Sequence, residues 1–230
     1  MDIISLTDKG VYRENNQDNY WAAVLDVNGE EAGVICLCDG MGGLENGELA
    51  SRLVTSAVRE YILKDFDFSG IIGVLEKVNR KIYNMSGGDN SKLMGTTCTI
   101  VMCYRGKYNV CHIGDSRGYL FRDGKSYQIT EDHSVVHKYR ITKEKDPMLW
   151  NKYKNKLTKC IGVGTEIEPA FYEGDYVKGD KFVVCSDGCW HVFDDIEMTN
   201  KEISNLYELF KVCKSHGERD NITAGVLKIE

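Results

Sequence analysis

Short acidic motifs occur along the whole chain, and each places a carboxylate beside a small or turn-forming residue. In chain order they are Asn16-Gln17-Asp18, Asp39-Gly40-Met41-Gly42-Gly43, Gly114-Asp115-Ser116-Arg117, Ser186-Asp187-Gly188 and Asp220-Asn221. Two of the motifs directly follow an apolar run of the kind that forms β-strands. A carboxylate at the end of a rigid strand suits a hard divalent cation, because Mg²⁺ and Mn²⁺ prefer oxygen ligands in near-octahedral geometry. One Asp-Gly pair is only a turn, but several motifs that close different elements predict a metal site.

The composition indicates an ordinary globular protein and argues against some partners. The 230 residues are 42% hydrophobic and 28% charged, with only two prolines, so we expect a single domain over residues 1–230. The net charge of −6 and the pI near 5.5 provide no basic field for nucleic acid or an anionic membrane. No apolar run reaches the length of a membrane span. We expect a monomer that binds neither nucleic acid nor membrane.

The nine cysteines show no metal-binding or disulfide pattern in the sequence. There is no Cys-x-x-Cys pair, and no spacing of cysteines and histidines suits zinc. Five cysteines lie inside apolar β-type runs, where a reduced thiol packs as a small hydrophobe: Cys36, Cys38, Cys98, Cys103 and Cys185. The odd count and the polar start Met1-Asp2 are typical of a reducing compartment, so we expect a cytoplasmic protein.

Most of the predicted secondary structure is strand. Runs rich in Val, Ile, Tyr, Thr and Cys that are broken by Gly, Asn and Asp predict the strands. They are Ile3–Leu6, Trp21–Val27, Gly33–Leu37, Thr96–Tyr104, Tyr108–Ile113, Gly118–Phe121, Tyr127–Ile129, Lys181–Cys185 and Ile222–Ile229. Apolar periodicity predicts one helix over Glu48–Leu63 and a second after a Ser69 cap. A third helix, Lys201–Lys214, follows a capping box of Thr199 and Glu202.

The order of these elements predicts the fold class. Strands come in blocks and helices are inserted in pairs, which favours an α+β fold of antiparallel sheets with helices packed outside. The stretch from His133 to Ile161 has little apolar periodicity and many Lys, Tyr and Asn residues. Because long irregular segments in compact domains are often functional, we predict a flap-like segment at about 133–161.

Taken together, the motifs resemble those of the type 2C metal-dependent serine/threonine protein phosphatases (PPM), in their bacterial form. The resemblance runs from Gly10-x-x-Arg13-x-x-Asn16-Gln17-Asp18 to Asp220-Asn221-Ile222-Thr223. Between them lie Asp39-Gly40-Met41-Gly42-Gly43 with Gly47-Glu48-x-Ala50-Ser51, then Gly95-Thr96-Thr97, Gly114-Asp115-Ser116-Arg117, Asp132-His133-Ser134 and Ser186-Asp187-Gly188. The resemblance implies a β-sandwich of two antiparallel sheets flanked by helix pairs. It also implies hydrolysis of phosphoserine and phosphothreonine in proteins, opposing a bacterial serine/threonine kinase and its targets.

The acidic residues suit phosphate ester chemistry. A phosphate monoester dianion repels nucleophiles, and two cations about 3.5–4 Å apart neutralise it and lower the pKa of a shared water nucleophile. Asp39 is the predicted bridging ligand, because it ends an apolar run and Gly40 leaves its carbonyl accessible as a further ligand. Asp187 and Asp220 complete the shell of one cation, and Asp18 lies nearer the second and acts through water. The resemblance places all five on metal positions of the family, for Mn²⁺ or Mg²⁺.

Two further residues have competing interpretations. Arg13 lies five residues before Asp18, and a guanidinium can bind two phosphate oxygens at once. The resemblance gives Arg13 that role, and the alternative is an ordinary surface arginine. Asp115 matches the position linked to a weaker third metal, and the alternative is a turn carboxylate that pairs with Arg117. Asn16 and Asn221 either orient the neighbouring carboxylates or cap turns.

The chain departs from the family at the expected proton donor. Met41 and Leu44 stand where relatives carry histidine, and neither side chain can donate a proton. The leaving alkoxide must then be protonated by a water held at the cations, which we favour, or by His133, with His137 as the second histidine candidate. His191 is interpreted as a structural or surface residue.

Two alternatives to a kinase-opposing phosphatase stay open at this point. The enzyme can act on a phosphorylated antagonist in a partner-switching pathway, or the chain can be a non-catalytic binding module with a phosphatase-like fold. Pseudoenzymes typically lose their metal carboxylates, and this chain keeps Asp18, Asp39, Asp187 and Asp220.

Overall fold

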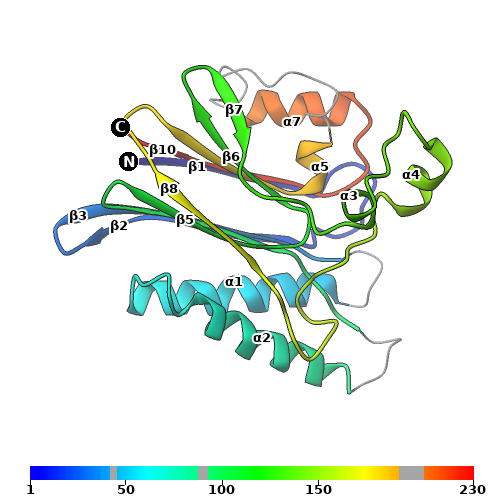
Figure 1. Ribbon diagram of the computed structural model, residues 1–230, viewed down its shortest axis with the longest axis horizontal. Coiled ribbons are helices and arrows are strands. Elements are labelled where there is room, and N and C mark those ends of the chain that lie inside the picture. Colours follow the sequence, from blue (N-terminus) through cyan, green and yellow to red (C-terminus); the bar gives the residue numbers. More distant parts are fainter. Residues whose placement is uncertain (42–45, 88–92, 192–204) are drawn as a thin grey trace.

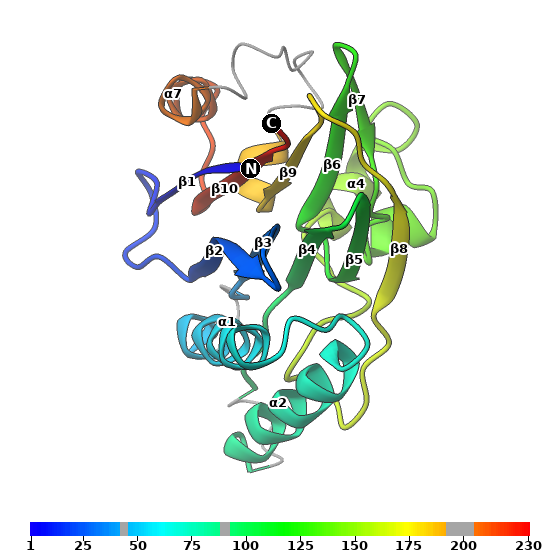
Figure 2. The ribbon, with the colours of Figure 1, turned by 90° about the vertical axis from the view of Figure 1, so that its left-hand side faces the viewer.

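The structure is a computed structural model that describes residues 1–41, 46–87, 93–191 and 205–230. Two antiparallel sheets face each other, and a pair of helices covers the outer face of each (Figure 1). Figure 2 shows the same four layers from the side. The predicted α+β sandwich is therefore confirmed.

Each sheet has five strands in the described part of the chain. The first sheet has the order β1 (Asp2–Asp8), β10 (Ile222–Lys228), β9 (Lys181–Cys185), β6 (Arg117–Arg122) and β7 (Lys125–Gln128). The second has the order β2 (Asp18–Val27), β3 (Glu30–Asp39), β4 (Cys98–Tyr104), β5 (Lys107–Ile113) and β8 (Ala170–Asp175). All neighbouring strands pair antiparallel.

Strand alternation divides the core into three layers. On β3, Ile35 and Leu37 point between the sheets, whereas Cys36 and Cys38 point towards the helices. This follows from the period of two in a strand, which sends successive side chains to opposite faces. A strand buried on both faces reads as a continuous apolar run, as Val34–Cys38 does.

Of the four described helices that cover the sheets, three were predicted, and the short helix Asp187–Trp190 was not. Those on the second sheet are α1 (Gly47–Lys64) and α2 (Ile71–Met85), and those on the first are α5 (Asp187–Trp190) and α7 (Leu206–Ser215). The predicted Ser69 cap is wrong: Gly70 precedes α2 without a side-chain cap, and the Ser69 backbone N–H bonds Asp67 instead. At α7 the cap is Asn205, which accepts the Glu208 N–H. The predicted capping box of Thr199 and Glu202 lies outside the described residues.

One strand was not predicted, and the flap-like segment contains two short helices. Strand β8 pairs with β5 at the sheet edge. Its sequence AFYEGD mixes acidic and aromatic residues, so it contains no apolar run that would predict a strand. Between His133 and Ile161 lie α3 (Val135–Lys138) and α4 (Pro147–Tyr153). Within the described ranges, no helix combines the length and apolarity that crossing a membrane requires.

Candidate metal centre and active site

The predicted carboxylates meet at one end of the sandwich. Asp18 begins β2 and Asp39 ends β3, and the two are direct partners in the antiparallel ladder. Asp187 lies two residues beyond the end of β9, and Asp220 lies two residues before β10, which pairs with β9. Asp115 precedes β6, the other neighbour of β9. Antiparallel pairing therefore brings together carboxylates that are up to 202 positions apart (220 − 18).

A pocket of ≈ 410 Å³ lies at this end. It is lined by Arg13, Asp39, Gly40, Met41, Thr97, Asp115, Asn155, Leu157, Asp187 and Asp220. All of the predicted site residues except Asp18 therefore line one pocket. Asp18 is buried beside it, and the charges of Asp187 and Asp220 act on its carboxylate. Asn155 and Leu157 were not predicted as site residues, because they come from the irregular segment and belong to no motif.

Burial and mutual repulsion raise the pKa values of the clustered carboxylates. Burial, together with the charges of Asp187 and Asp220, raises the pKa of Asp18 to about 7. Burial raises the pKa of Asp39 well above its ordinary value, and the neighbouring charges of Asp18 and Asp187 add to this. Burial, with the nearby Asp187, also raises the pKa of Asp115. Carboxylates that repel one another in this way need a cation to be charged together.

Unpartnered oxygen atoms point to the same conclusion. Both carboxylate oxygens of Asp18 and Oδ1 of Asp187 are buried without a hydrogen-bond partner among the described residues. Buried charged oxygens are costly unless they are paired or coordinate a metal. Because all the donors are oxygens, the cluster fits a hard divalent cation such as Mn²⁺ or Mg²⁺.

The backbone at Asp39 is fixed on both sides. Its N–H donates to Thr97 Oγ1 at 2.9 Å, and its carbonyl accepts the Thr97 N–H at 2.9 Å and the Thr96 hydroxyl at 2.9 Å. At Gly40 a side chain is impossible, because a Cβ would collide with the carbonyl oxygens of Gly47 and Gln17. Glycine therefore lets this turn lie directly against the start of α1.

Arg13 faces the pocket rather than open solvent. Its Nη2 lies 2.5 Å from Oδ2 of Asp220, and this hydrogen bond raises the pKa of Arg13. The side chain is 39% exposed, so its guanidinium borders both the pocket and the solvent. This position is not that of an ordinary surface arginine.

The two asparagines hold backbone rather than carboxylates. Asn221 donates to the carbonyls of Lys9 and Asn15, at 2.8 and 3.0 Å, and accepts the Gln17 N–H at 2.9 Å. Asn16 accepts the Asp18 N–H at 3.1 Å. These bonds fix the loop that carries Arg13. The role of the two asparagines is therefore closer to turn capping than to the orientation of carboxylates.

The surroundings of Asp115 disfavour the simple turn interpretation. Arg117 forms its ion pair with Asp132, through Nε at 2.9 Å and Nη2 at 2.8 Å, and its guanidinium lies 3.4 Å from the centroid of the Trp190 ring. The indole N–H of Trp190 donates to the Asp115 carbonyl at 2.8 Å. These contacts anchor the turn and leave the Asp115 carboxylate at the pocket.

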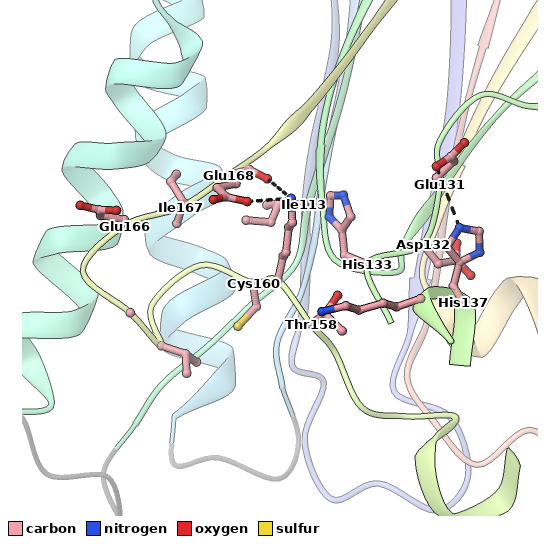
Figure 3. Close-up of a pocket in the computed structure, with 14 residues that line it drawn as sticks. Ile113, Glu131, Asp132, His133, His137, Thr158, Cys160, Glu166, Ile167 and Glu168 are labelled. Atoms are coloured by element: carbon pink, nitrogen blue, oxygen red, sulfur yellow. Dashed lines mark hydrogen bonds and ion pairs between the residues drawn. The ribbon is translucent and has the colours of Figure 1, made fainter. Parts of the chain in front are cut away.

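The candidate proton donors lie elsewhere. His133 and His137 line a separate pocket of ≈ 690 Å³, where Glu131 lies beside His137 (Figure 3). His133 Nδ1 accepts the Gly114 N–H at 3.1 Å, and burial lowers the pKa of His133 to about 4. The imidazole of His133 is therefore neutral at pH 7. His133 is also not among the residues that line the catalytic pocket. Met41 lies in the catalytic pocket, and Leu44 lies outside the described residues.

A His133→Ala variant separates a structural role from a catalytic one. We expect hydrolysis of an aryl phosphate and of a phosphothreonine peptide to fall by the same small factor, roughly threefold or less. A general acid would contribute about 10²–10⁴-fold, and it would matter far more for the peptide, whose leaving group is the poorer one. Steady-state kinetics on both substrates measure this. A loss of about 100-fold on the peptide alone would assign the proton to His133.

His191 is closer to the carboxylates than the sequence suggested. Although burial lowers it, the pKa of His191 is raised overall by the Glu218 carboxylate and by Asp187. Its Nδ1 lies 3.6 Å from a Glu218 carboxylate oxygen. No motif marked this histidine, because its acidic neighbours come from other segments.

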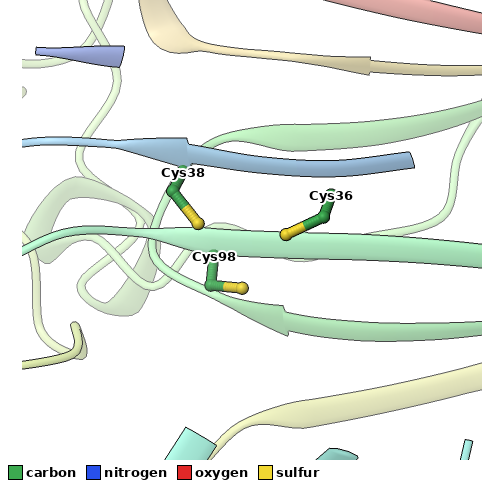
Figure 4. A group of neighbouring side chains, drawn as sticks. All are labelled: Cys36, Cys38 and Cys98. Carbon is green, nitrogen blue, oxygen red and sulfur yellow. The ribbon is translucent and has the colours of Figure 1, made fainter. Parts of the chain in front are cut away.

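A second group of possible metal ligands consists of thiols. The sulfur atoms of Cys36, Cys38 and Cys98 lie within 4.8 Å of one another, on β3 and β4 (Figure 4). The sequence analysis did not predict this group, because Cys98 is distant in the chain and joins Cys36 and Cys38 only through the pairing of β3 with β4. All three are buried in the core beneath the helices of the second sheet, and a hard cation prefers oxygen ligands. The carboxylate pocket is therefore the better candidate for hydrolysis.

Known proteins share this sequence and this fold. The family model for protein phosphatase 2C matches residues 12–224. The serine/threonine phosphatase stp of Listeria monocytogenes serotype 4b (strain F2365) is 30% identical over 241 residues, which cover 97% of this chain and 93% of that protein. Protein phosphatase PhpP of Streptococcus pneumoniae serotype 2 (strain D39 / NCTC 7466) is 30% identical over 247 residues, covering 100% and 98%. The solved structure of the S. agalactiae serine/threonine phosphatase matches with a TM-score of 0.81 at 31% identity, covering 100% and 99%.

Proposed function

The chain belongs to the protein phosphatase 2C family, and we propose that its carboxylate pocket is where phosphoserine and phosphothreonine are hydrolysed. The predicted resemblance is confirmed, and with it the activity of a metal-dependent protein serine/threonine phosphatase. The non-catalytic alternative is disfavoured, because the relatives are named phosphatases and the acidic residues gather in one pocket. The observation that carries the assignment is this convergence of mutually repelling carboxylates with one arginine.

The pocket is proposed to hold two divalent cations, Mn²⁺ or Mg²⁺, and a weaker third. Asp39 is the shared ligand, Asp187 and Asp220 serve one cation, and Asp18 serves the other through water. The Gly40 carbonyl is a further ligand, and Asp115 serves the third cation. When bound, the cations neutralise the phosphate and make a water molecule acidic enough to act as the nucleophile. The oxygen-only donor set and the unpartnered oxygens of Asp18 and Asp187 support this assignment.

Side chains of the protein position the phosphate and the metal-binding carboxylates. Arg13 binds two phosphate oxygens with its planar guanidinium, and Asp220 holds that group in place at the edge of the pocket. Thr97 fixes the backbone of Asp39, so its carboxylate needs little reorganisation during the reaction. Leu157 and Met41 cover part of the pocket wall and limit the access of bulk water. No described histidine lines this pocket, so water supplies the proton to the leaving alkoxide.

The role of Arg13 is tested by Arg13→Lys. We expect kcat/KM for a phosphothreonine peptide to fall about 100-fold, because an ammonium group cannot bind two phosphate oxygens in one plane. Inorganic phosphate should also become a weaker competitive inhibitor. Arg105→Lys is the matched control, since Arg105 pairs with Glu30 on the surface and exposed ion pairs contribute little. Wild-type kinetics in Arg13→Lys would remove Arg13 from the site.

The enzyme is proposed to be a single-domain cytoplasmic protein that acts opposite a kinase. Residues 1–230 form one catalytic domain, in which segment 133–161 is a flap that contributes Asn155 and Leu157 to the pocket. The nine cysteines are all free, which supports a reducing cytoplasm. We place the enzyme opposite a bacterial-type serine/threonine kinase, acting on that kinase and its targets as a monomer.

A further inference from the structure

A second pocket, of ≈ 780 Å³, adjoins the catalytic one. The two pockets share Arg13, Asn155 and Asp220 in their walls, so they lie directly beside each other. One wall comes from the flap-like segment: Thr142, Lys143, Glu144, Trp150, Lys154 and Asn155. The other comes from the turn before β10: Gly217, Glu218, Arg219 and Asp220, with His191 and Arg13 beside it. A peptide whose phosphate reaches the carboxylates has this pocket next to it.

The acidic side chains nearest the catalytic pocket already have partners. Asp220 pairs with Arg13 at 2.5 Å. Glu218 lies 3.6 Å from His191 and accepts the backbone N–H groups of Arg219 and Asp220 at 2.7 and 2.9 Å. Asp220 and Glu218 therefore do not cancel the remaining cationic side chains. The third acidic residue of this pocket, Glu144, accepts hydrogen bonds from its own backbone N–H and from Thr142, and these bonds, with the charges of Lys143 and Lys145, lower its pKa.

Two cationic side chains in this pocket can bind an anionic group of a substrate. Lys154 and Arg219 are exposed, and neither forms an ion pair with any part of the chain that the structure describes. The Arg219 guanidinium lies 5.5 Å from the centroid of the Tyr12 ring, which orients it. Lys143 lines the same wall. The chain has a net charge of −6, so a general excess of basic residues does not explain these cationic side chains beside the active site.

We propose that this cationic pocket binds a glutamate or aspartate that flanks the phosphorylated residue of the substrate. The inference rests on the proposed function and specifies its substrate class. Lys154 and Arg219 form charge-assisted hydrogen bonds to the carboxylate, one from the flap and one from the turn before β10. The half-exposed ring of Trp150 supports the peptide between them. The positive charges of Lys154 and Arg219 offset the repulsion between an acidic flank and the catalytic carboxylates.

The test compares two phosphothreonine peptides that differ only in their flanks, Glu in one and Gln in the other. With the Mn²⁺-loaded wild type, we expect kcat/KM to favour the Glu peptide by about 3- to 10-fold, mainly through KM, because two exposed ion pairs contribute this much. The preference should shrink in 0.5 M salt. In the double variant Lys154→Gln, Arg219→Gln the ratio should approach one. Lys178→Gln, an exposed lysine in the turn after β8, should keep the wild-type ratio.

The possible outcomes separate this inference from the proposed function. Hydrolysis of both peptides with equal kcat/KM in the wild type would overturn the flank site and leave the phosphatase activity standing. A double variant that keeps the full preference would also overturn it. Hydrolysis of neither peptide would instead contradict the proposed function.

Discussion

Replacing Asp39 by Asn is expected to lower turnover of a phosphothreonine peptide by about 10³-fold or more. Asp39 lies at the centre of the carboxylate group, and the charges of Asp18, Asp187, Asp115 and Asp220 all act on it. An amide in its place keeps the shape and the backbone bonds to Thr97, but removes the charge that a shared metal ligand must carry. The measurement is kcat at saturating Mn²⁺.

The control for this variant is an exposed carboxylate at a distance from the site. Asp175 ends β8 and pairs with Lys107 on the surface, so Asp175→Asn should keep wild-type turnover. A thermal melt of Asp39→Asn should show a folded protein, since the substitution relieves repulsion in the metal-free state. Turnover above about a tenth of wild type would show that Asp39 is not the shared ligand.

The second large effect concerns stability, which in the metal-free protein should fall as pH rises from about 4 to about 7. The ordinary pKa of an aspartate in the unfolded chain is about 3.9, and that of Asp18 in the fold is about 7. Between these values the folded state binds more protons than the unfolded state, so raising the pH costs stability. The cost is fully present above pH 7 and is of the order of a few kcal/mol.

Asp18→Asn tests this contribution together with that of Asp39, because the charge of Asp18 adds to burial in raising the pKa of Asp39. With chelator present, the variant should melt at a higher temperature than wild type at pH 8, and the two should converge near pH 4. Mn²⁺ should stabilise wild type more at pH 8 than at pH 5, since protons compete with the metal for carboxylates. A metal-free wild type that is more stable than Asp18→Asn at pH 8 would contradict the raised pKa.

The sequence predicted the elements whose patterns are strong. Strand β9 was predicted with its observed bounds, and α1 within one residue at each end, because each has a clear apolar period. Strand β8 was missed because it lies at a sheet edge and none of its residues is buried, so its sequence contains no apolar run. The Ser69 cap was wrong because the Ser69 hydroxyl bonds the Asp67 carboxylate and caps no backbone N–H of α2.

The candidate site was predictable because its carboxylates lie at or beside the ends of strands, and antiparallel pairing brings these ends together. Contacts between distant segments were not predictable in this way. Asn155 and Leu157 reach the pocket from an irregular segment, and the bond between Gly114 and His133 turns that histidine towards another pocket. No local pattern encodes such contacts, which depend on the packing of the whole domain.

Calorimetric titration of Mn²⁺ into metal-stripped protein, with peptide turnover measured on the same samples, tests the central claim most directly. The wild type should bind the cation, and turnover should rise with occupancy and disappear in excess chelator. Asp39→Asn should lose this binding together with the activity. Full turnover of the stripped wild type in chelator, or an unchanged Mn²⁺ isotherm in Asp39→Asn, would contradict a carboxylate-held metal centre.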